Sequence, residues 1–427
     1  MNQKLVSASS VNELCQLAEK SFNILDGVNM STICNMLTKL KPKQPDSSDI
    51  LAVDTIRRLV PKWIELPATD SGKGAQGCVN VLHSIGTFNI RDDSLWRPVL
   101  GSLLLLRREL TPQNASNSIY AIALLDIRDE SLWRPIAEAA VRLRQHFNGQ
   151  GAANSLYAFA LIGIRDQSLL QPIIKAVIRE NSQMIPKEVA MSLYGLAKLD
   201  IRDDSAWITI AAAMVRLCHD FTEQGAANSF LSLAIASLWC KSSNLQTAIN
   251  SIVDVLIPRI RSMANIEHIR QLLQADFVLK RLDQISTNIL LDKLKYINQV
   301  YDQKPSATCR AVMKTLQEMQ MGHRISSEHP YFHGIYPVDI VVHMVDGDIL
   351  IQIDGPSHYN FLGGLPNCHI LNGETVLRNY ILMGLGYRVV TVPYFEWDAL
   401  RTSSKRQQYL QKLLDGAKIS LTKPSPL

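Results

Sequence analysis

Apolar and polar positions alternate with a helical period over most of the chain, and one stretch shows the unit from which this part is built. Residues Pro112–Leu125 carry apolar side chains three and four residues apart, which predicts a helix with Ala115, Ile119, Ile122 and Ala123 on its apolar face. Asp129 can then cap a second helix, which runs from Ser131 to about Phe147. Two helices alone cannot bury their apolar faces, so several such units should stack.

The unit recurs along the chain at a fixed interval. The tripeptide Ile-Arg-Asp appears four times, 37 residues apart, and its arginines are Arg91, Arg128, Arg165 and Arg202. Eleven residues before them stand Asn80, Asn117, Asn154 and Met191, and one further period reaches Asn228 in a decayed fifth copy. Four copies in phase predict an α-solenoid of two-helix repeats with a concave surface.

The repeats set the expected domain boundaries. We expect degenerate helical repeats and a linker over residues 1–75, the 37-residue repeats over 76–240, and a helical adaptor or diverged repeats over 241–305. A small α/β domain should follow over 306–420, because strand patterns begin only there.

This last domain is organised around Ile349–Tyr359, where an apolar strand ends in the turn Asp354-Gly355-Pro356. Pro337–Val342 predicts a neighbouring strand, joined to the first by a tight turn at Asp346-Gly347. His323–Tyr336 is either irregular or contains a first strand. The other expected elements are a helix over Ala307–Met321, a loop over Phe361–Gly373, a helix over Glu374–Gly386, a strand over Tyr387–Val392 and a helix over Asp398–Leu414.

Composition narrows the class of protein. A hydrophobic fraction of 47% with 19% charged residues describes a folded chain, and a net charge of +5 is compatible with a polyanionic partner. The seven cysteines contain no CxxC pair, which argues against a zinc knuckle or a disulfide framework and favours a reducing compartment. We expect no signal peptide, transmembrane segment or membrane partner, because no apolar run is long enough.

Several motifs of the C-terminal domain, in order over roughly residues 310–415, resemble the RAP domain. They are Val338-Asp339-Ile340, the run from Ile351 to Tyr359, the run from Leu377 to Leu382, the run from Gly386 to Val390 and the run from Pro393 to Trp397. The helices before it are similar to the octotricopeptide and FASTK-type repeats of organellar RNA-processing factors. The resemblance implies RNA binding, a cytoplasmic or organellar-matrix location, and a fold similar to restriction-endonuclease-like nucleases of the very-short-patch repair type.

The nuclease resemblance implies a candidate catalytic site. In that fold, carboxylates on neighbouring strands bind Mg²⁺, which polarises the phosphate and activates water. The resemblance assigns the metal to Asp339 and catalytic roles to Asp339, Gln352, Asp354 and His358, with His358 as the base. Gln352 stands where many RAP domains carry Glu, and Asp354 where a nuclease carries Lys. The alternative is structural: Asp354 caps the turn, and His358 hydrogen-bonds a loop.

The repeats carry candidate RNA-binding residues. Arg91, Arg128, Arg165 and Arg202 could bind phosphates in a row, or could cap their own helices and pair with the adjacent aspartates. The row of Asn80, Asn117, Asn154 and Asn228 could read base edges or bond from repeat to repeat. Tyr120, Tyr157 and Tyr194 could stack on bases, although packing between repeats is favoured for them.

These observations predict an RNA-binding protein of RNA processing or stability, with single-stranded RNA held on the repeats and the RAP domain. The first alternative is an endoribonuclease dependent on Mg²⁺, the one cofactor considered. The second is a protein-interaction scaffold, because α-solenoids bind peptides as readily as RNA.

Overall fold

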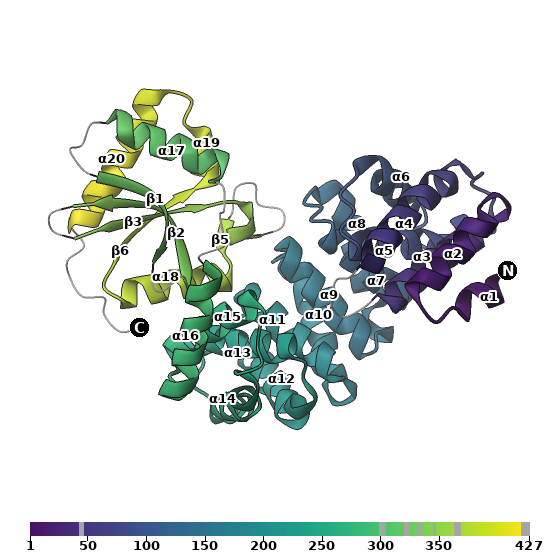
Figure 1. The fold of residues 1–427 in the computed structure, drawn as a ribbon, viewed down its shortest axis with the longest axis horizontal. Helices are drawn as coiled ribbons and strands as arrows, with labels where there is room; N and C mark the ends of the chain where they lie inside the picture. The colour runs from purple at the N-terminus through teal and green to yellow at the C-terminus, as the bar shows by residue number, and fades with distance from the viewer. Residues whose placement is uncertain are drawn as a thin grey trace. The chain divides into compact units, whose positions relative to one another are not determined.

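The structure is a computed structural model that describes residues 1–41, 47–298, 305–319, 324–331, 335–344, 347–362 and 369–419. It is mostly helical, with a small sheet near the C-terminal end (Figure 1). The chain divides into two compact units, one comprising Met1–Gly195 with Leu362–Pro366 and the other comprising Leu196–Phe361 with Asn367–Leu427. The expected turn at Asp346 lies outside the described residues.

The first unit is built from helices joined by short turns. They are α1 (Asn2–Val6), α2 (Val11–Ser21), α3 (Gly27–Leu40), α4 (Ser47–Glu65), α5 (Ala75–Thr87), α6 (Asp93–Leu105), α7 (Pro112–Leu124), α8 (Glu130–Leu143), α9 (Gly149–Ile162), α10 (Gln167–Glu180) and most of α11 (Pro186–Lys198). Helix α3 packs beside α5, α5 beside α7, and α7 beside α9. The alternate helices α4, α6, α8 and α10 contact one another in the same order, so each helix pair lies against the next.

The aspartate of each Ile-Arg-Asp tripeptide begins the second helix of its pair, as predicted. Asp92, Asp129 and Asp166 accept hydrogen bonds from the backbone N–H of Ser94, Ser131 and Ser168, at 3.0, 3.0 and 2.9 Å. Helix α8 ends at Leu143, earlier than expected, because the chain tightens into a 3-10 turn over Arg144–His146.

A residue with a left-handed backbone follows the first helix of the four pairs that carry an Ile-Arg-Asp tripeptide. Asn89, Asp126 and Gly163 have φ of 51°, 55° and 87°, and Asp200 in the second unit, at the same repeat position, has 50°. Gly, Asn and Asp are the residues that tolerate this conformation, which closes the last turn of a helix. The 37-residue period therefore repeats a turn as well as two helices.

The second unit continues with helix pairs before its sheet. Its helices are α12 (Asp204–Leu217), α13 (Glu223–Ser237), α14 (Ser243–Leu256), α15 (Ile266–Leu279), α16 (Gln284–Asn298), α17 (Ala307–Glu318), α18 (Gly373–Gly384), α19 (Tyr394–Ala399) and α20 (Ser403–Ile419). Helix α13 packs beside α15, and α12 beside α14, as in the first unit. The pairing thus continues past residue 241, where the sequence period is lost.

The sheet contains four strands in the order β1-β2-β3-β6: β1 (Arg324–Tyr331), β2 (Tyr336–His343), β3 (Ile349–Asp354) and β6 (Arg388–Pro393). The first three run antiparallel, and β6 joins β3 in parallel after the helix α18. The sequence predicts that His323–Tyr336 is either irregular or contains a first strand, and the structure has the strand β1 there. The expected loop Phe361–Gly373 contains the strand β5 (His369–Leu371), which pairs with β4 (Tyr359–Phe361) at the start of the loop.

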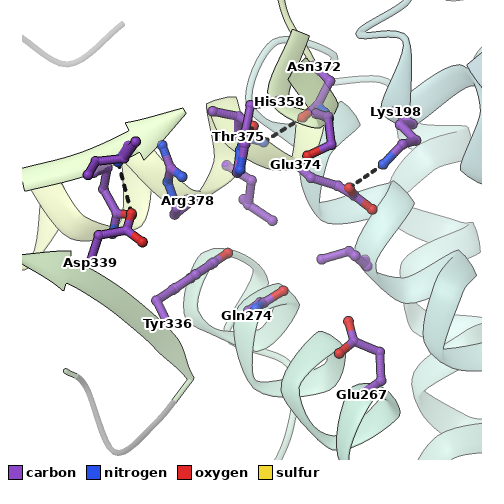
Figure 2. Close-up of a pocket in the computed structure, with 15 residues that line it drawn as sticks. Lys198, Glu267, Gln274, Tyr336, Asp339, His358, Asn372, Glu374, Thr375 and Arg378 are labelled. Carbon is purple, nitrogen blue, oxygen red and sulfur yellow. Dashed lines mark hydrogen bonds and ion pairs between the residues drawn. The ribbon is translucent and has the colours of Figure 1, made fainter. Parts of the chain in front are cut away.

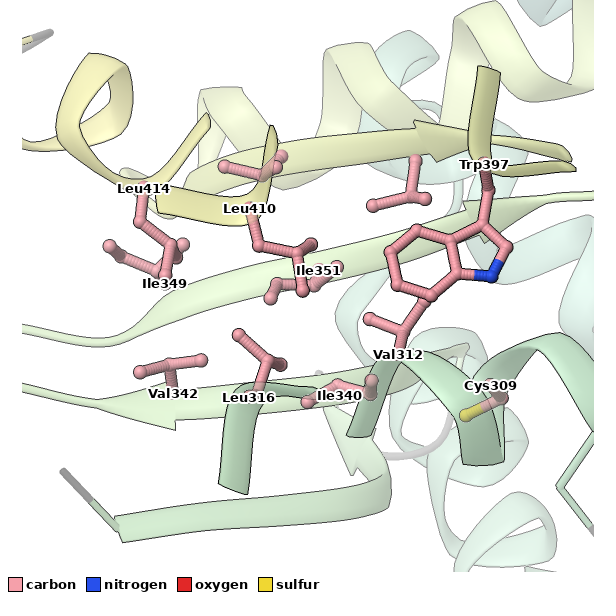
Figure 3. Close-up of a cluster of buried hydrophobic side chains, with 12 residues drawn as sticks. Cys309, Val312, Leu316, Ile340, Val342, Ile349, Ile351, Trp397, Leu410 and Leu414 are labelled. Carbon is pink, nitrogen blue, oxygen red and sulfur yellow. The ribbon is translucent and has the colours of Figure 1, made fainter. Parts of the chain in front are cut away.

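A hydrophobic cluster on one face of the sheet forms the core of the C-terminal domain (Figure 3). Alternate residues of the strands, such as Ile340, Ile351 and Val390, meet residues of α17, α19 and α20, with Trp397 at one end. The single last helix expected from the sequence is two helices, because the chain is extended at Leu400 between α19 and α20. Helix α18 lies on the other face of the sheet (Figure 1).

Candidate functional site

The strand alternation brings three of the predicted catalytic residues to the face of the sheet under α18. The β2–β3 register pairs Ile340 with Ile351 on the hydrophobic face, and continuing it places Asp339 opposite Gln352 on the other. A carboxylate oxygen of Asp339 accepts a hydrogen bond of 2.8 Å from the Ile353 N–H, which ties the two strands together. Gln352 is 2% exposed.

Asp354, at the end of β3, is fully buried, and its main partner is a cation. The Arg378 guanidinium of α18 donates from Nη2 to Asp354 Oδ1 at 2.8 Å. His358 Nδ1 lies 3.7 Å from the same oxygen. Asp354 therefore neutralises a buried arginine. This role differs from both predicted roles, which were capping the turn and taking part in a metal-dependent site.

His358 follows in the short turn Pro356–His358, and its Nδ1 lies 3.0 Å from Thr375 Oγ1. Burial lowers the pKa of His358, although the Asp354 carboxylate opposes that shift. The imidazole is therefore neutral at physiological pH. A neutral imidazole can accept or donate a proton at the nitrogen not bonded to Thr375.

Asp339, Gln352 and His358 line one pocket of about 430 Å³, and Asp354 does not. All the lining residues belong to the second compact unit. Helices α11 and α15 supply Lys198, Glu267 and Gln274, while β2 supplies Tyr336 (Figure 2). Lys198 Nζ of α11 and the Glu374 carboxylate of α18 form an ion pair of 2.6 Å in the lining of this pocket.

The donor set does not fit Mg²⁺. This ion requires several oxygen ligands, mostly anionic, at octahedral geometry. Asp354 is already paired with a guanidinium, Gln352 is neutral, and Asp339 is bonded to the backbone. Among the described residues, no three His, Cys, Asp or Glu side chains are grouped so that they could hold a metal ion.

Three of the four repeat arginines, Arg91, Arg128 and Arg202, bond within the turns that carry them. Arg91 Nε donates to Asn89 Oδ1 and Arg128 Nε to Asp126 Oδ1, both at 2.8 Å. Arg128 Nη1 also reaches the Ile162 carbonyl of the next pair at 3.3 Å. In the second unit, Arg202 Nε lies 3.4 Å from Asp200. The Nε of each of these three guanidinium groups therefore holds the side chain against its own turn.

A second row of residues follows the first helices of the pairs. The rings of His83, Tyr120, Tyr157 and Tyr194 lie one per pair, with centroids 6.0, 6.1 and 5.4 Å apart. Three residues before each tyrosine is the asparagine or methionine position, where Asn154 Nδ2 donates to Asn117 Oδ1 at 3.4 Å. Asn80 instead accepts from Gln76 within α5, at 2.8 Å.

Sequence reasoning missed part of each site. Four residues before each asparagine position stand exposed polar side chains, namely Gln76, Gln113, Gln150, Lys187 and Gln224. These and His83 are in phase with the repeat, so the 37-residue interval could have identified them. Arg378 lies in a quoted RAP motif, but its pairing with Asp354 has no signal in the sequence. Lys198, Gln274 and Tyr336 reach the pocket only through tertiary packing.

Two further observations concern the described helices and cysteines. No described helix has the length and apolar character that crossing a membrane requires. The cysteines that the structure describes are free thiols, each of them buried: Cys15, Cys34, Cys78, Cys218, Cys240 and Cys309.

Comparison with known proteins agrees with this division into helices and a sheet domain. Residues 351–413 match the RAP domain family, and residues 68–176 match the family described as RNA-editing substrate-binding complex 6 protein. A RAP domain-containing chloroplastic protein of Oryza sativa subsp. japonica is 30% identical over 93 residues. That alignment covers 22% of this chain and 13% of the rice protein. The chain therefore carries a RAP domain at its C-terminal end, preceded by a helical region that matches an RNA-editing substrate-binding complex family.

Proposed function

We propose that this protein binds single-stranded RNA along the first helices of its helix pairs and acts in RNA processing or stability. One observation carries the proposal: the continuous row of His83, Tyr120, Tyr157 and Tyr194, flanked in phase by amide side chains. A single strand exposes its bases to stacking and to hydrogen bonds with amides. We further propose that the stacked pairs form an α-solenoid whose concave surface carries this row.

The helix pairs carry side chains suited to contacts with bases and others suited to contacts with phosphates. Exposed amides such as Gln113 and Gln150 can bond to base edges, and the half-buried tyrosine rings offer their edges and faces. Arg91 and Arg128 are fixed through Nε, which leaves terminal nitrogens of the guanidinium to donate to phosphate oxygens. The turn bond orients each arginine and lowers the entropy lost when it binds.

The comparisons support the proposal at a coarser level. The RAP family and the RNA-editing substrate-binding complex family are both associated by name or precedent with RNA. The second name also refers to a protein complex, so a protein partner on the helical region is part of the proposal. The rice relative is named as chloroplastic, and on that ground we propose the organellar matrix rather than the cytoplasm for this chain.

Salt dependence of RNA binding tests the proposal. Anisotropy of a labelled, unstructured RNA is followed with the full chain between about 50 and 200 mM salt. Wild-type protein should show a steep negative slope of log K against log salt. Replacing Arg128 and Arg165 together by Ala should flatten the slope by about 1.4, since each of the two phosphate contacts on a single strand contributes about 0.7.

The control replaces two exposed lysines outside the repeats. Lys295→Ala with Lys314→Ala removes the same charge from side chains that are 57% and 78% exposed. Its slope should match wild type. Thermal unfolding of each variant shows whether loss of the Arg128 bond to Ile162 has loosened the stack. Weak binding without salt dependence would contradict RNA binding and favour the protein-interaction scaffold.

A further inference from the structure

The pocket beside the sheet contains buried polar groups that the fold itself does not use. Tyr336 of β2 is 7% exposed, and its hydroxyl makes no hydrogen bond to any residue that the structure describes. Figure 2 shows that hydroxyl pointing into the pocket. Burial raises the pKa of Tyr336, so the group keeps its proton and can donate. Buried hydroxyls ordinarily have a partner, which here a bound molecule would supply.

Two neighbours present further unused polar atoms. Arg378 is also 7% exposed, and its Nη2 donates to Asp354. The same Nη2 and the Nε also donate to Asn379 Oδ1, at 2.9 and 3.1 Å. Within the described chain, Nη1 has no hydrogen-bond partner. Gln274 donates from Nε2 to the Ile335 carbonyl at 3.1 Å, which fixes the amide while its oxygen can still accept. The pocket wall thus combines fixed donors and fixed acceptors.

The charge balance of the pocket decides the class of ligand. Its two cations are each paired with a carboxylate, Lys198 with Glu374 at 2.6 Å and Arg378 with Asp354 at 2.8 Å. Asp339 and Glu267 add two further carboxylates to the lining. A site with no surplus of positive charge is poorly suited to a phosphate group. It suits a flat, neutral molecule whose edge carries both donors and acceptors.

We propose that this pocket receives one unpaired nucleobase of a bound RNA strand. A nucleobase is neutral, planar and rimmed by donors and acceptors, and proteins read such an extruded base on its edge. A volume of about 430 Å³ lies in the range of small-molecule sites. The inference rests on the proposed function, because it names the part of the RNA that the RAP domain and the adjacent helices hold.

Binding of nucleosides, which carry no phosphate, tests the inference. The four ribonucleosides and inorganic phosphate are titrated separately into the full chain by calorimetry or ligand-observed NMR. At least one nucleoside should bind, and inorganic phosphate should not compete with it. Tyr336→Phe should weaken nucleoside binding about five-fold, the effect of one lost hydrogen bond.

Tyr336→Phe also has a signature that a merely structural residue would not give. Because the hydroxyl has no described protein partner, its removal should leave the denaturation midpoint unchanged or raised while nucleoside affinity falls. Tyr380→Phe is the matched control, because Tyr380 of α18 is 48% exposed and does not line this pocket. It should change neither quantity.

The outcomes separate this inference from the proposed function. If the full chain binds RNA with a steep salt slope but no nucleoside, or if phosphate displaces the nucleoside, the pocket inference is wrong and RNA binding stands. If Tyr336→Phe leaves nucleoside affinity unchanged, the inference is also wrong. If nucleosides bind in a Tyr336-dependent way but single-stranded RNA does not, the proposed function fails instead.

Discussion

The role of a buried charged residue in this protein depends on the group that compensates its charge. Asp354 is fully buried, and the Arg378 guanidinium compensates its charge at 2.8 Å. Removing one partner of such a pair leaves an uncompensated charge, which costs about 3–5 kcal/mol. This explains how a residue that the nuclease resemblance made catalytic can have a structural role within the RAP domain.

A histidine begins the ring row where the other pairs have tyrosine, and it should make stability depend on pH. Burial, helped by the Lys187 charge, lowers the pKa of His83 from 6.5 to about 4. Between these values the unfolded chain binds a proton that the folded chain does not. The stability contributed by neutral His83 is therefore lost as pH falls below about 6.5, by at most about 1.4 kcal/mol per pH unit.

His83→Tyr should remove this dependence, because tyrosine occupies the same position in the next three pairs. Urea midpoints between about pH 4.5 and 7.5, the range in which histidine titrates, provide the measurement. The variant should lose less stability than wild type on acidification. His146→Gln, at an exposed histidine, is the control and should behave like wild type. Parallel curves for wild type and His83→Tyr would contradict the assignment.

At the scale of elements, a helix end determines how the RAP domain meets the helices beside it in the second unit. Gly373 begins α18, and a Cβ built there would lie 2.0 Å from the Ala197 carbonyl oxygen of α11. Backbone atoms cannot give way as a flexible side chain can. The absence of a side chain at Gly373 therefore permits the close contact, which the Lys198–Glu374 ion pair adjoins.

Gly373→Ala should destabilise the protein by roughly 1–3 kcal/mol, because it forces the two backbones apart. Gly384→Ala, in the same helix, is the control: the nearest atom to its Cβ is Phe277 Cε1 at 3.8 Å, an ordinary contact. That change should be neutral or stabilise by about 0.5–1 kcal/mol, since alanine favours helix over glycine. Chemical denaturation compares the two, and equal midpoints would show that the contact is not tight.

At the scale of the whole molecule, the proposed RNA binding and the alternative endoribonuclease activity call for different arrangements of side chains. The helix pairs present a periodic row, while the RAP pocket contains paired charges and no grouped metal ligands among the described residues. Such an arrangement favours binding. The similarity to restriction-endonuclease-like nucleases remains a prediction of the resemblance.

We therefore expect a labelled RNA to stay intact when the full chain is incubated with Mg²⁺ or Mn²⁺. Asp339→Ala should give the same result as wild type, as seen by gel electrophoresis of the products. Metal-dependent cleavage by wild type that Asp339→Ala abolishes would instead establish the endoribonuclease. Cleavage that persists in the variant would indicate a contaminating nuclease.

The repeat was predictable because local rules act once per period. The apolar spacing, the capping aspartate at Asp129 and the turn residue two positions before each arginine depend only on neighbours in the chain. The β3 strand and its turn were predictable for the same reason. The end of α8, the break between α19 and α20 and the β4–β5 pair were not, because cross-strand pairing and packing decided them.

The sequence by itself determined that this protein has in-phase helix pairs and a C-terminal domain with RAP motifs, since both are patterns among near neighbours. The tertiary structure alone decided which polar groups meet. It paired Asp354 with Arg378, 24 residues away, and brought Gln274 of a helix and Tyr336 of a strand into one pocket. The physical reason is that burial and charge compensation depend on distances in space, which spacing along the chain does not fix.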